Sequence, residues 1–283
     1  MLSNPWIAAM IALFAWWFFT GVILVAVRVS DRMGARARRM AVLGAVPILA
    51  LGVWGYSSSL DEATMPNVYI AFASALLIWG WIELAFLNGI ITGPNLRECP
   101  DDLPEWERFI RAWGTIAYHE MLLVAVLILM AVYGHDSANP FGLWTFALLF
   151  AARISAKLNL YLGVPKINIE FLPSPLLHLA SHFRIQQMNW LFPISVSVLT
   201  FAVACWLERM MGVTTPAETL GFALLAAMTA LALLEHWFMV LPLPDEKLWH
   251  WMLPAPKHNK TTKAYTEDAH GLRQPVQRPA RHP

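Results

Sequence analysis

The sequence predicts an all-α fold, a polytopic membrane bundle of about seven transmembrane helices. Of the 283 residues, 58% are hydrophobic and only 14% are charged, whereas soluble domains carry about 25% charged residues. Apolar runs of about 20 residues, long enough to cross a bilayer as helices, recur along the chain. The lysines and arginines gather in alternate connections between these runs. This composition cannot cover a water-facing surface, and it excludes a soluble globular enzyme.

The apolar runs place the predicted helices in chain order. They are expected over residues 6–27, 41–56, 68–91, 113–133, 141–162, 190–207 and 218–241. The first run is not expected to be a cleavable signal peptide, because no basic residue precedes it and its arginines follow it. No disulfide framework is expected, because the chain has only 2 cysteines, Cys99 and Cys205, and the predicted topology places them on opposite sides of the membrane.

The distribution of basic residues predicts how the helices are oriented. Short connections that stay in the cytoplasm are enriched in Lys and Arg. All but one of the 20 basic residues lie in or close to the connections after the first, third, fifth and last predicted helices, and the exception is Arg209. We therefore expect the N-terminus outside the membrane and the C-terminus in the cytoplasm, which requires an odd number of spans.

Two segments between spans are typical of helices that lie on the membrane surface. One is 171–190, where Pro173 and Pro175 prevent a continuous helix at the start. The other is 104–113, whose apolar side chains recur at helical spacing on one face; they are Trp106, Phe109, Ile110 and Trp113.

The domain organisation follows from where the apolar runs end. Residues 1–245 are expected to form a single transmembrane helical domain. Residues 246–283 are polar and have no hydrophobic periodicity, so we expect a cytoplasmic tail that is mobile beyond about residue 257.

Ionisable side chains inside the predicted spans are the candidate functional residues. Each costs at least about 2.5 kcal/mol at membrane depth unless it is paired or hydrated. At a rise of about 1.5 Å per residue, they lie roughly 8–13 Å from the cytoplasmic boundary, on four helices. The sequence therefore predicts one intramembrane polar cluster, which consists of Glu83, His119, Glu120, Arg153, Lys157, Glu235 and His236.

Four roles are open for this cluster. The favoured one is an interhelical ion-pair network that fixes the packing of the bundle. The second is pigment docking, with His119 or His236 binding the magnesium of a chlorin. The third is a metal site of carboxylates and imidazoles, although the Glu-x-x-His spacing of two-iron helix bundles is absent and neighbours such as His119 and Glu120 point about 100° apart. The fourth is a proton or substrate pathway.

His178 and His182 form a second candidate, because residues four apart share one face of an α-helix. An interfacial helix whose polar side chains face the lipid headgroups is the favoured interpretation of this pair. No catalytic motif is present, so the catalytic residues stay unknown. The candidate pigment or metal ligands are His119, Glu120, His178, His182, Glu235 and His236.

Several long strings carry a family resemblance. They are WGWIELAFLNGIITGPN (79–95), PEWERFIRAWGTIAYHEMLL (104–123), NPFGLWTFALLFAARISAKLNLYLGVP (139–165), MNWLFPISV (188–196) and LLEHWFMVLPLPDEKLWHWMLPAP (233–256). In these strings the chain resembles the PuhE-type photosynthetic complex assembly proteins of anoxygenic phototrophic bacteria. The resemblance runs from Trp6 to Lys257 and leaves out only the tail.

The resemblance implies a multi-pass protein of the bacterial inner, photosynthetic membrane. It implies a role in assembling the reaction centre and core antenna, with an influence on bacteriochlorophyll supply. The implied partners are membrane lipid together with reaction-centre and light-harvesting subunits or pigment-making enzymes, and nucleic acid is not among them. As a cofactor, bacteriochlorophyll or a precursor is favoured over iron. No ligand or catalytic residue is carried over from the family.

Two other functions compete with an assembly role. One is a membrane-bound, metal-dependent oxidoreductase that acts on a tetrapyrrole or carotenoid, and the weaker one is a pigment or lipid transporter. Ion pairs between the glutamates and Arg153 or Lys157 would favour assembly. An open, apolar-walled cavity with three or more unpaired His or Glu ligands would favour the enzyme. On balance a non-enzymatic role is favoured.

Overall fold

The computed structural model describes residues 4–100, 102–167, 169, 172–241, 265–267 and 273–275. The chain divides into two units, Met1–Met252 and Leu253–Pro283. In the second unit, strand β1 (Tyr265–Glu267) pairs antiparallel with strand β2 (Arg273–Pro275). The other residues of the predicted mobile tail beyond residue 257 lie outside the described residues.

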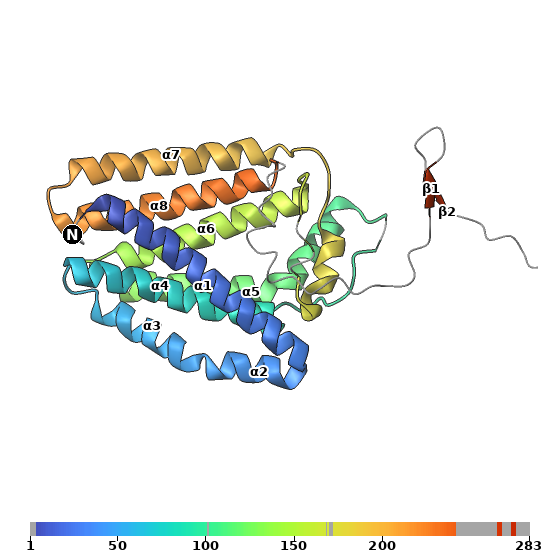
Figure 1. Ribbon diagram of the computed structural model, residues 1–283, viewed down its shortest axis with the longest axis horizontal. Coiled ribbons are helices and arrows are strands. Elements are labelled where there is room, and N and C mark those ends of the chain that lie inside the picture. Colours follow the sequence, from blue (N-terminus) through green and yellow to red (C-terminus); the bar gives the residue numbers. More distant parts are fainter. Residues whose placement is uncertain are drawn as a thin grey trace, which may run out of the picture. The chain divides into compact units, whose positions relative to one another are not determined.

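The first unit is built from α-helices, as predicted, and Figure 1 shows their arrangement. Within the part of the chain that the structure describes, 7 helical segments are long and apolar enough to cross a membrane, the second of them being α2 and α3 together. A 3₁₀ helix, η2 (Ser174–His182), follows α6. The helices are α1 (Pro5–Met33), α2 (Ala35–Gly44), α3 (Val46–Ser58), α4 (Met65–Leu87), α5 (Glu105–Tyr133), α6 (Phe141–Leu162), α7 (Leu191–Gly212) and α8 (Pro216–Phe238).

The helix ends differ from the predicted ones where local backbone chemistry outweighs hydrophobicity. Helix α1 continues past the predicted end at residue 27 and stops where Gly34 adopts a φ of 92°, a conformation that favours glycine. The second span breaks at Ala45, two residues before Pro47 in the first turn of α3, where a proline is well tolerated. The predicted interfacial segment 104–113 is part of α5 rather than a separate helix.

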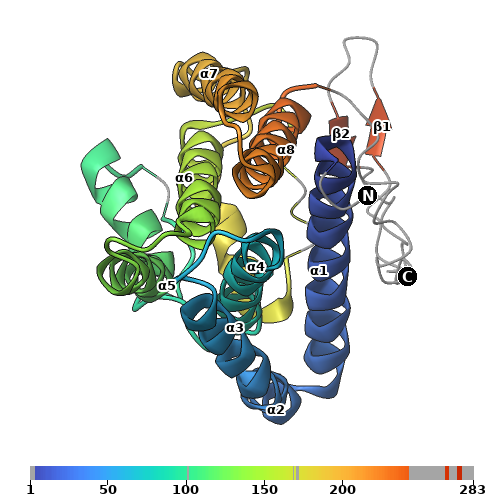
Figure 2. The same cartoon turned by 90° about the vertical axis from the view of Figure 1, so that its left-hand side faces the viewer.

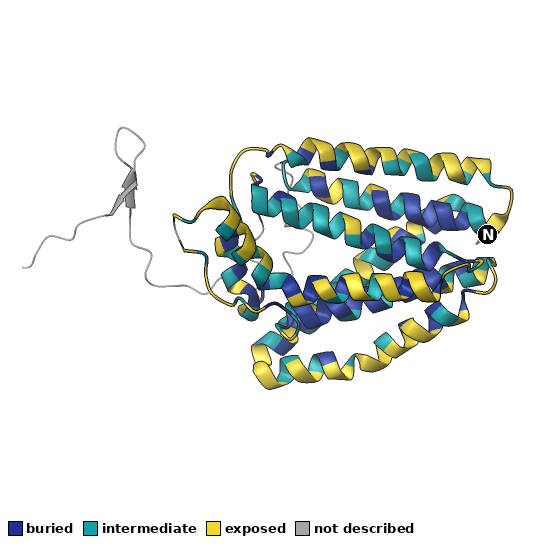
Figure 3. Ribbon diagram, turned by 180° about the vertical axis from the view of Figure 1, so that it is seen from behind, coloured by how far each residue is buried: buried dark blue, intermediate teal, exposed yellow. Residues whose placement is uncertain are grey.

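Helices α4 and α8 supply most of the protein core, and the remaining helices surround them. Figure 3 shows the buried residues gathered on these two helices, whereas α7 and α1 are largely exposed. Helix α1 packs against α8 and α4, as Figure 2 shows from the end of the bundle. The exposed side chains of α1 include Phe14, Trp17 and Phe18. Apolar side chains on the outside of a helical bundle are what lipid contact requires.

The connection between α4 and α5 docks on the α5 backbone. The Asn95 N–H donates to the Gly114 carbonyl at 3.0 Å, and the His119 N–H donates to the Thr92 carbonyl at 3.0 Å. Gly93 lies between these bonds, so close to α5 that a Cβ atom there would stand 2.1 Å from the Gly114 oxygen. Figures 1 and 2 show the first turns of α5 at an angle to the rest of the helix. A segment inserted into the helical hydrogen-bond ladder is a recognised cause of such a bend.

The orientation of the helices stays a prediction, and thiol labelling tests it. In a Cys205→Ser background, a membrane-impermeant maleimide is expected to leave native Cys99 unlabelled in sealed right-side-out vesicles. A cysteine introduced by His135→Cys, in the exposed connection between α5 and α6, is expected to react at once. Detergent permeabilisation should expose Cys99. Labelling of Cys99 but not of position 135 in sealed vesicles would show that the orientation is opposite to the predicted one.

Candidate functional site

Five of the seven predicted intramembrane polar residues gather at one place. Arg153 of α6 donates from Nη2 to Glu83 Oε2 of α4 at 2.9 Å, and Lys157 of α6 donates to Glu120 of α5. The His119 Nε2 atom lies 3.7 Å from Glu83 Oε1 and 4.0 Å from Glu120 Oε1. The cluster therefore consists of two interhelical ion pairs with a buried imidazole between their carboxylates.

Helix geometry explains the two ion pairs. Arg153 and Lys157 are four residues apart, so they lie on the same face of α6 and reach two neighbouring helices. Their partners Glu83 and Glu120 are both buried. A buried carboxylate is tolerated when it is paired and hydrogen-bonded. These contacts place α4, α5 and α6 in one register relative to each other.

His119 and Glu120 are both buried although they are adjacent in sequence. Glu120 faces α6, whereas the His119 ring packs on Phe86 of α4 at a centroid distance of 4.3 Å. The α4–α5 connection covers the His119 backbone, because Thr92 accepts its N–H. The two side chains point about 100° apart, as predicted, and both are buried because α4 and α6 contact α5 on two sides at this level.

Glu235 and His236 are not part of the ion-pair cluster. Glu235 Oε1 accepts a hydrogen bond from Trp16 Nε1 of α1 at 2.9 Å. The His236 ring donates from Nδ1 to the Ala232 carbonyl. Its Nε2 atom lies 2.8 Å from the Ser155 hydroxyl oxygen. Among the described residues, no group of three or more His, Cys, Asp or Glu side chains is arranged to hold a metal ion.

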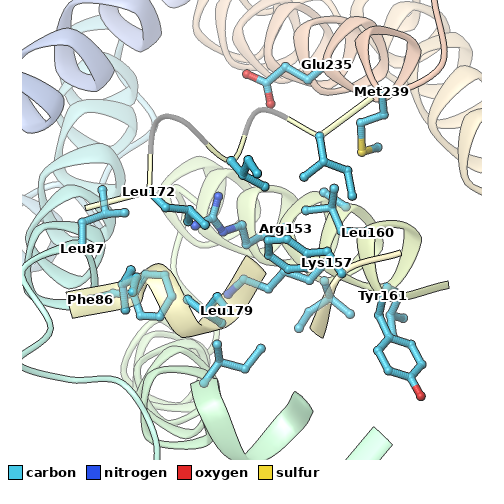
Figure 4. Close-up of a pocket in the computed structure, with 18 of the residues that line it drawn as sticks. Phe86, Leu87, Arg153, Lys157, Leu160, Tyr161, Leu172, Leu179, Glu235 and Met239 are labelled. Carbon is cyan, nitrogen blue, oxygen red and sulfur yellow. The ribbon is translucent and has the colours of Figure 1, made fainter. Parts of the chain in front are cut away.

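A partly open cavity of about 770 Å³ borders the cluster, and Figure 4 shows part of its lining. Its size is within the range of about 300–1,000 Å³ that is typical of small-molecule sites. The lining is mainly apolar and comes from α1, α4, α5, α6, η2 and α8, with Glu120, Arg153, Lys157, His182 and Glu235 among the polar members. The cavity therefore joins a polar cluster to apolar walls inside the transmembrane unit.

His178 and His182 do not share a helix face, because η2 is a 3₁₀ helix. With three residues per turn, residues four apart point about 120° away from each other. The His182 ring is buried and its Nδ1 atom lies 3.2 Å from the His178 carbonyl. Burial lowers the pKa of His182 below the usual imidazole value, which favours the neutral ring at neutral pH.

The sequence interpretation missed Trp16 as part of the site. Its position deep in the first apolar run is the signal that was available, because a buried indole N–H needs an acceptor. The acceptor, Glu235, lies 219 positions away in the chain. A sequence pattern identifies both as polar groups in a span but does not pair them.

Comparisons with known proteins identify the family of this chain. Residues 2–260 match the family described as "Protein of unknown function (DUF3623)". The "Uncharacterized 30.4 kDa protein in puhA 5'region" of Rhodobacter capsulatus is 53% identical over 254 residues, which cover 90% of this chain and 93% of that protein. No solved structure matches the chain significantly. The chain belongs to the DUF3623 family.

Proposed function

We propose that the protein is an integral membrane factor for assembly of the photosynthetic reaction centre and core antenna, and that it handles bacteriochlorophyll or its supply. The observation that carries this proposal is the relative at 53% identity, whose name places it in the 5' region of puhA, a photosynthesis-gene neighbourhood. The proposed location is the bacterial inner, photosynthetic membrane. The proposed partners are reaction-centre or light-harvesting subunits, or pigment-making enzymes.

The polar cluster supports a non-catalytic role. Glu83 and Glu120 are neutralised by Arg153 and Lys157, which is what a network that fixes helix packing requires. The neighbouring apolar cavity supports the pigment part of the proposal, because it is large enough for a small lipophilic molecule.

The oxidoreductase alternative needs several of these carboxylates and imidazoles around one metal. In the structure, Glu235 is bound to Trp16 and His236 contacts Ser155, away from the Glu83 and Glu120 ion pairs. This separation of the ligands gives the alternative less support than the assembly role.

Deletion of the gene in its phototrophic host tests the proposal. We expect the near-infrared absorption of the reaction centre and core antenna in isolated membranes to fall at least about two-fold, because assembly or pigment supply becomes limiting. A plasmid copy should restore it. Unchanged complex levels and unchanged total bacteriochlorophyll would contradict an assembly role.

Metal analysis of the protein purified in mild detergent provides the second measurement. Iron at one or more equivalents per chain would contradict a purely assembling role and favour the oxidoreductase. Bound chlorin near one equivalent would support pigment handling.

A further inference from the structure

The position of the cavity restricts what can enter it. Helix η2 with the residues beside it closes one side, and most of the walls come from membrane-spanning helices, including Leu13 of α1, Ile116 of α5 and Leu231 of α8. Their side chains offer mainly dispersion contacts and no hydrogen bonds. A ligand that reaches the cavity through the bilayer must therefore be lipophilic over most of its surface.

The polar end of the cavity keeps hydrogen-bond donors that the ion pairs do not use. Arg153 carries five N–H groups, and among the described residues its hydrogen bond to Glu83 uses Nη2 alone. Its side chain is 37% exposed although α6 spans the membrane. Lys157 has three N–H groups and donates to Glu120 while it lies 5.3 Å from the centre of the Phe86 ring. Figure 4 shows Lys157 extending from α6 toward Leu179, and Arg153 extending from the same helix on the side of Leu172.

The charges at this end are already balanced. Arg153 is paired with Glu83, and Lys157 is paired with Glu120. Glu235 and Lys166 add one further acidic and one further basic side chain to the lining. Among the described lining residues an anionic headgroup such as a phosphate or carboxylate would meet no unpaired cation, whereas a neutral carbonyl oxygen accepts hydrogen bonds without adding charge.

Aromatic side chains cover several walls of the cavity. They come from five helices and from the residue after η2, and they include Trp16, Phe86, Trp113, Tyr161, Phe183 and Phe238. Aromatic faces and edges pack well against flat conjugated rings. The walls therefore offer packing surfaces for a ring system, with aliphatic side chains between them for an attached tail.

We propose that this cavity is a binding site for a neutral lipophile with a flat conjugated ring and a carbonyl oxygen that accepts hydrogen bonds from Arg153 and Lys157. Quinones and tetrapyrroles with keto or ester groups share this chemistry. The site stands independently of the assembly role, because the helices, charges and walls that define it do not depend on a partner protein.

Ligand titration of the purified full-length protein tests the site. Decylubiquinone and a zinc chlorin with a keto group are the two probes, and a ring hydrocarbon with the same tail but no oxygen is the reference. Binding is followed by quenching of tryptophan fluorescence for the quinone and by the shift of the absorption band for the chlorin. We expect saturable binding of at least one carbonyl probe at one equivalent, at least ten-fold tighter than the reference.

Two matched variants on α6 separate the cavity from the rest of the surface. Ala156→Phe places a large ring in the cavity lining, and Ala151→Phe makes the same change at an exposed position outside that lining. We expect Ala156→Phe to weaken binding of the carbonyl probe at least ten-fold. Ala151→Phe should leave the affinity for the probe unchanged. Arg153→Lys keeps a cation beside Glu83 but removes two N–H donors. We therefore expect about a five-fold loss of affinity for the carbonyl probe. Monodisperse elution and an unchanged thermal melt confirm that each variant is folded.

The outcomes also distinguish this site from the proposed function. Chlorin binding supports both the site and pigment handling, whereas quinone binding alone supports the site and removes support from pigment handling. The site is overturned if neither probe binds, if the oxygen-free reference binds equally well, or if Ala156→Phe has no effect. The proposal is also overturned if neither probe binds and a phospholipid co-purifies with the protein but not with Ala156→Phe, because the occupant of the cavity is then a lipid.

Discussion

Replacement of Glu83 by alanine is expected to destabilise the protein strongly, because it leaves Arg153 without its carboxylate partner. The Arg153–Glu83 pair has an N–O distance of 2.9 Å, and the Glu83 side chain is only 9% exposed. Removing one partner of a buried pair costs about 3–5 kcal/mol. Since Arg153 is 37% exposed, we expect the lower end of this range. That is a fall of roughly 6–12 °C in the thermal midpoint measured in mild detergent, with a lower folded yield.

The control for this prediction is an ion pair at the surface. Glu105→Ala breaks the exposed contact with Arg184, which is expected to cost less than about 1 kcal/mol. The double variant Glu83→Leu, Arg153→Leu removes both charges and is expected to recover much of the lost stability. If Glu83→Ala keeps its yield and midpoint but loses a bound pigment or metal, Glu83 is a ligand. Normal yield together with normal accumulation of photosynthetic complexes would count against both roles.

Replacement of Gly93 by alanine is expected to have an effect of similar size for a steric reason. The added Cβ would lie 2.1 Å from the Gly114 oxygen and 2.7 Å from the Thr115 carbonyl carbon. Both are backbone atoms of α5, so no side chain can rotate to relieve the contact. Overpacking costs about 1–3 kcal/mol, and each hydrogen bond lost from the α4–α5 connection adds about 1 kcal/mol.

The Gly93 prediction is measured by the thermal midpoint and by hydrogen exchange. We expect faster exchange at the Asn95 and His119 amides, whose bonds to α5 and to Thr92 hold the connection in place. Gly212→Ala is the matched control, because no atom lies within 4 Å of the position its Cβ would take. If the thermal midpoint and the amide exchange of Gly93→Ala are both unchanged, the α4–α5 connection does not determine the bend in α5.

The polar cluster illustrates how far sequence patterns reach. Glu83 and Arg153 are recognisable as residues with a role because a charge inside an apolar run must find a partner. Their common depth follows from the rise of the helix alone. Which carboxylate binds which cation depends on how each helix is rotated about its axis. That rotation is set by packing between helices, and local sequence does not encode it.

The sequence by itself determined the all-α membrane fold, the number of spans and the set of intramembrane polar residues. These properties depend on segment length and on the cost of placing each side chain in an apolar medium, both of which are local. Only the tertiary structure decided that Trp16 binds Glu235, that His236 contacts Ser155, and that a cavity borders the ion pairs. These features arise between helices distant in sequence, where small changes in tilt and rotation decide which side chains meet.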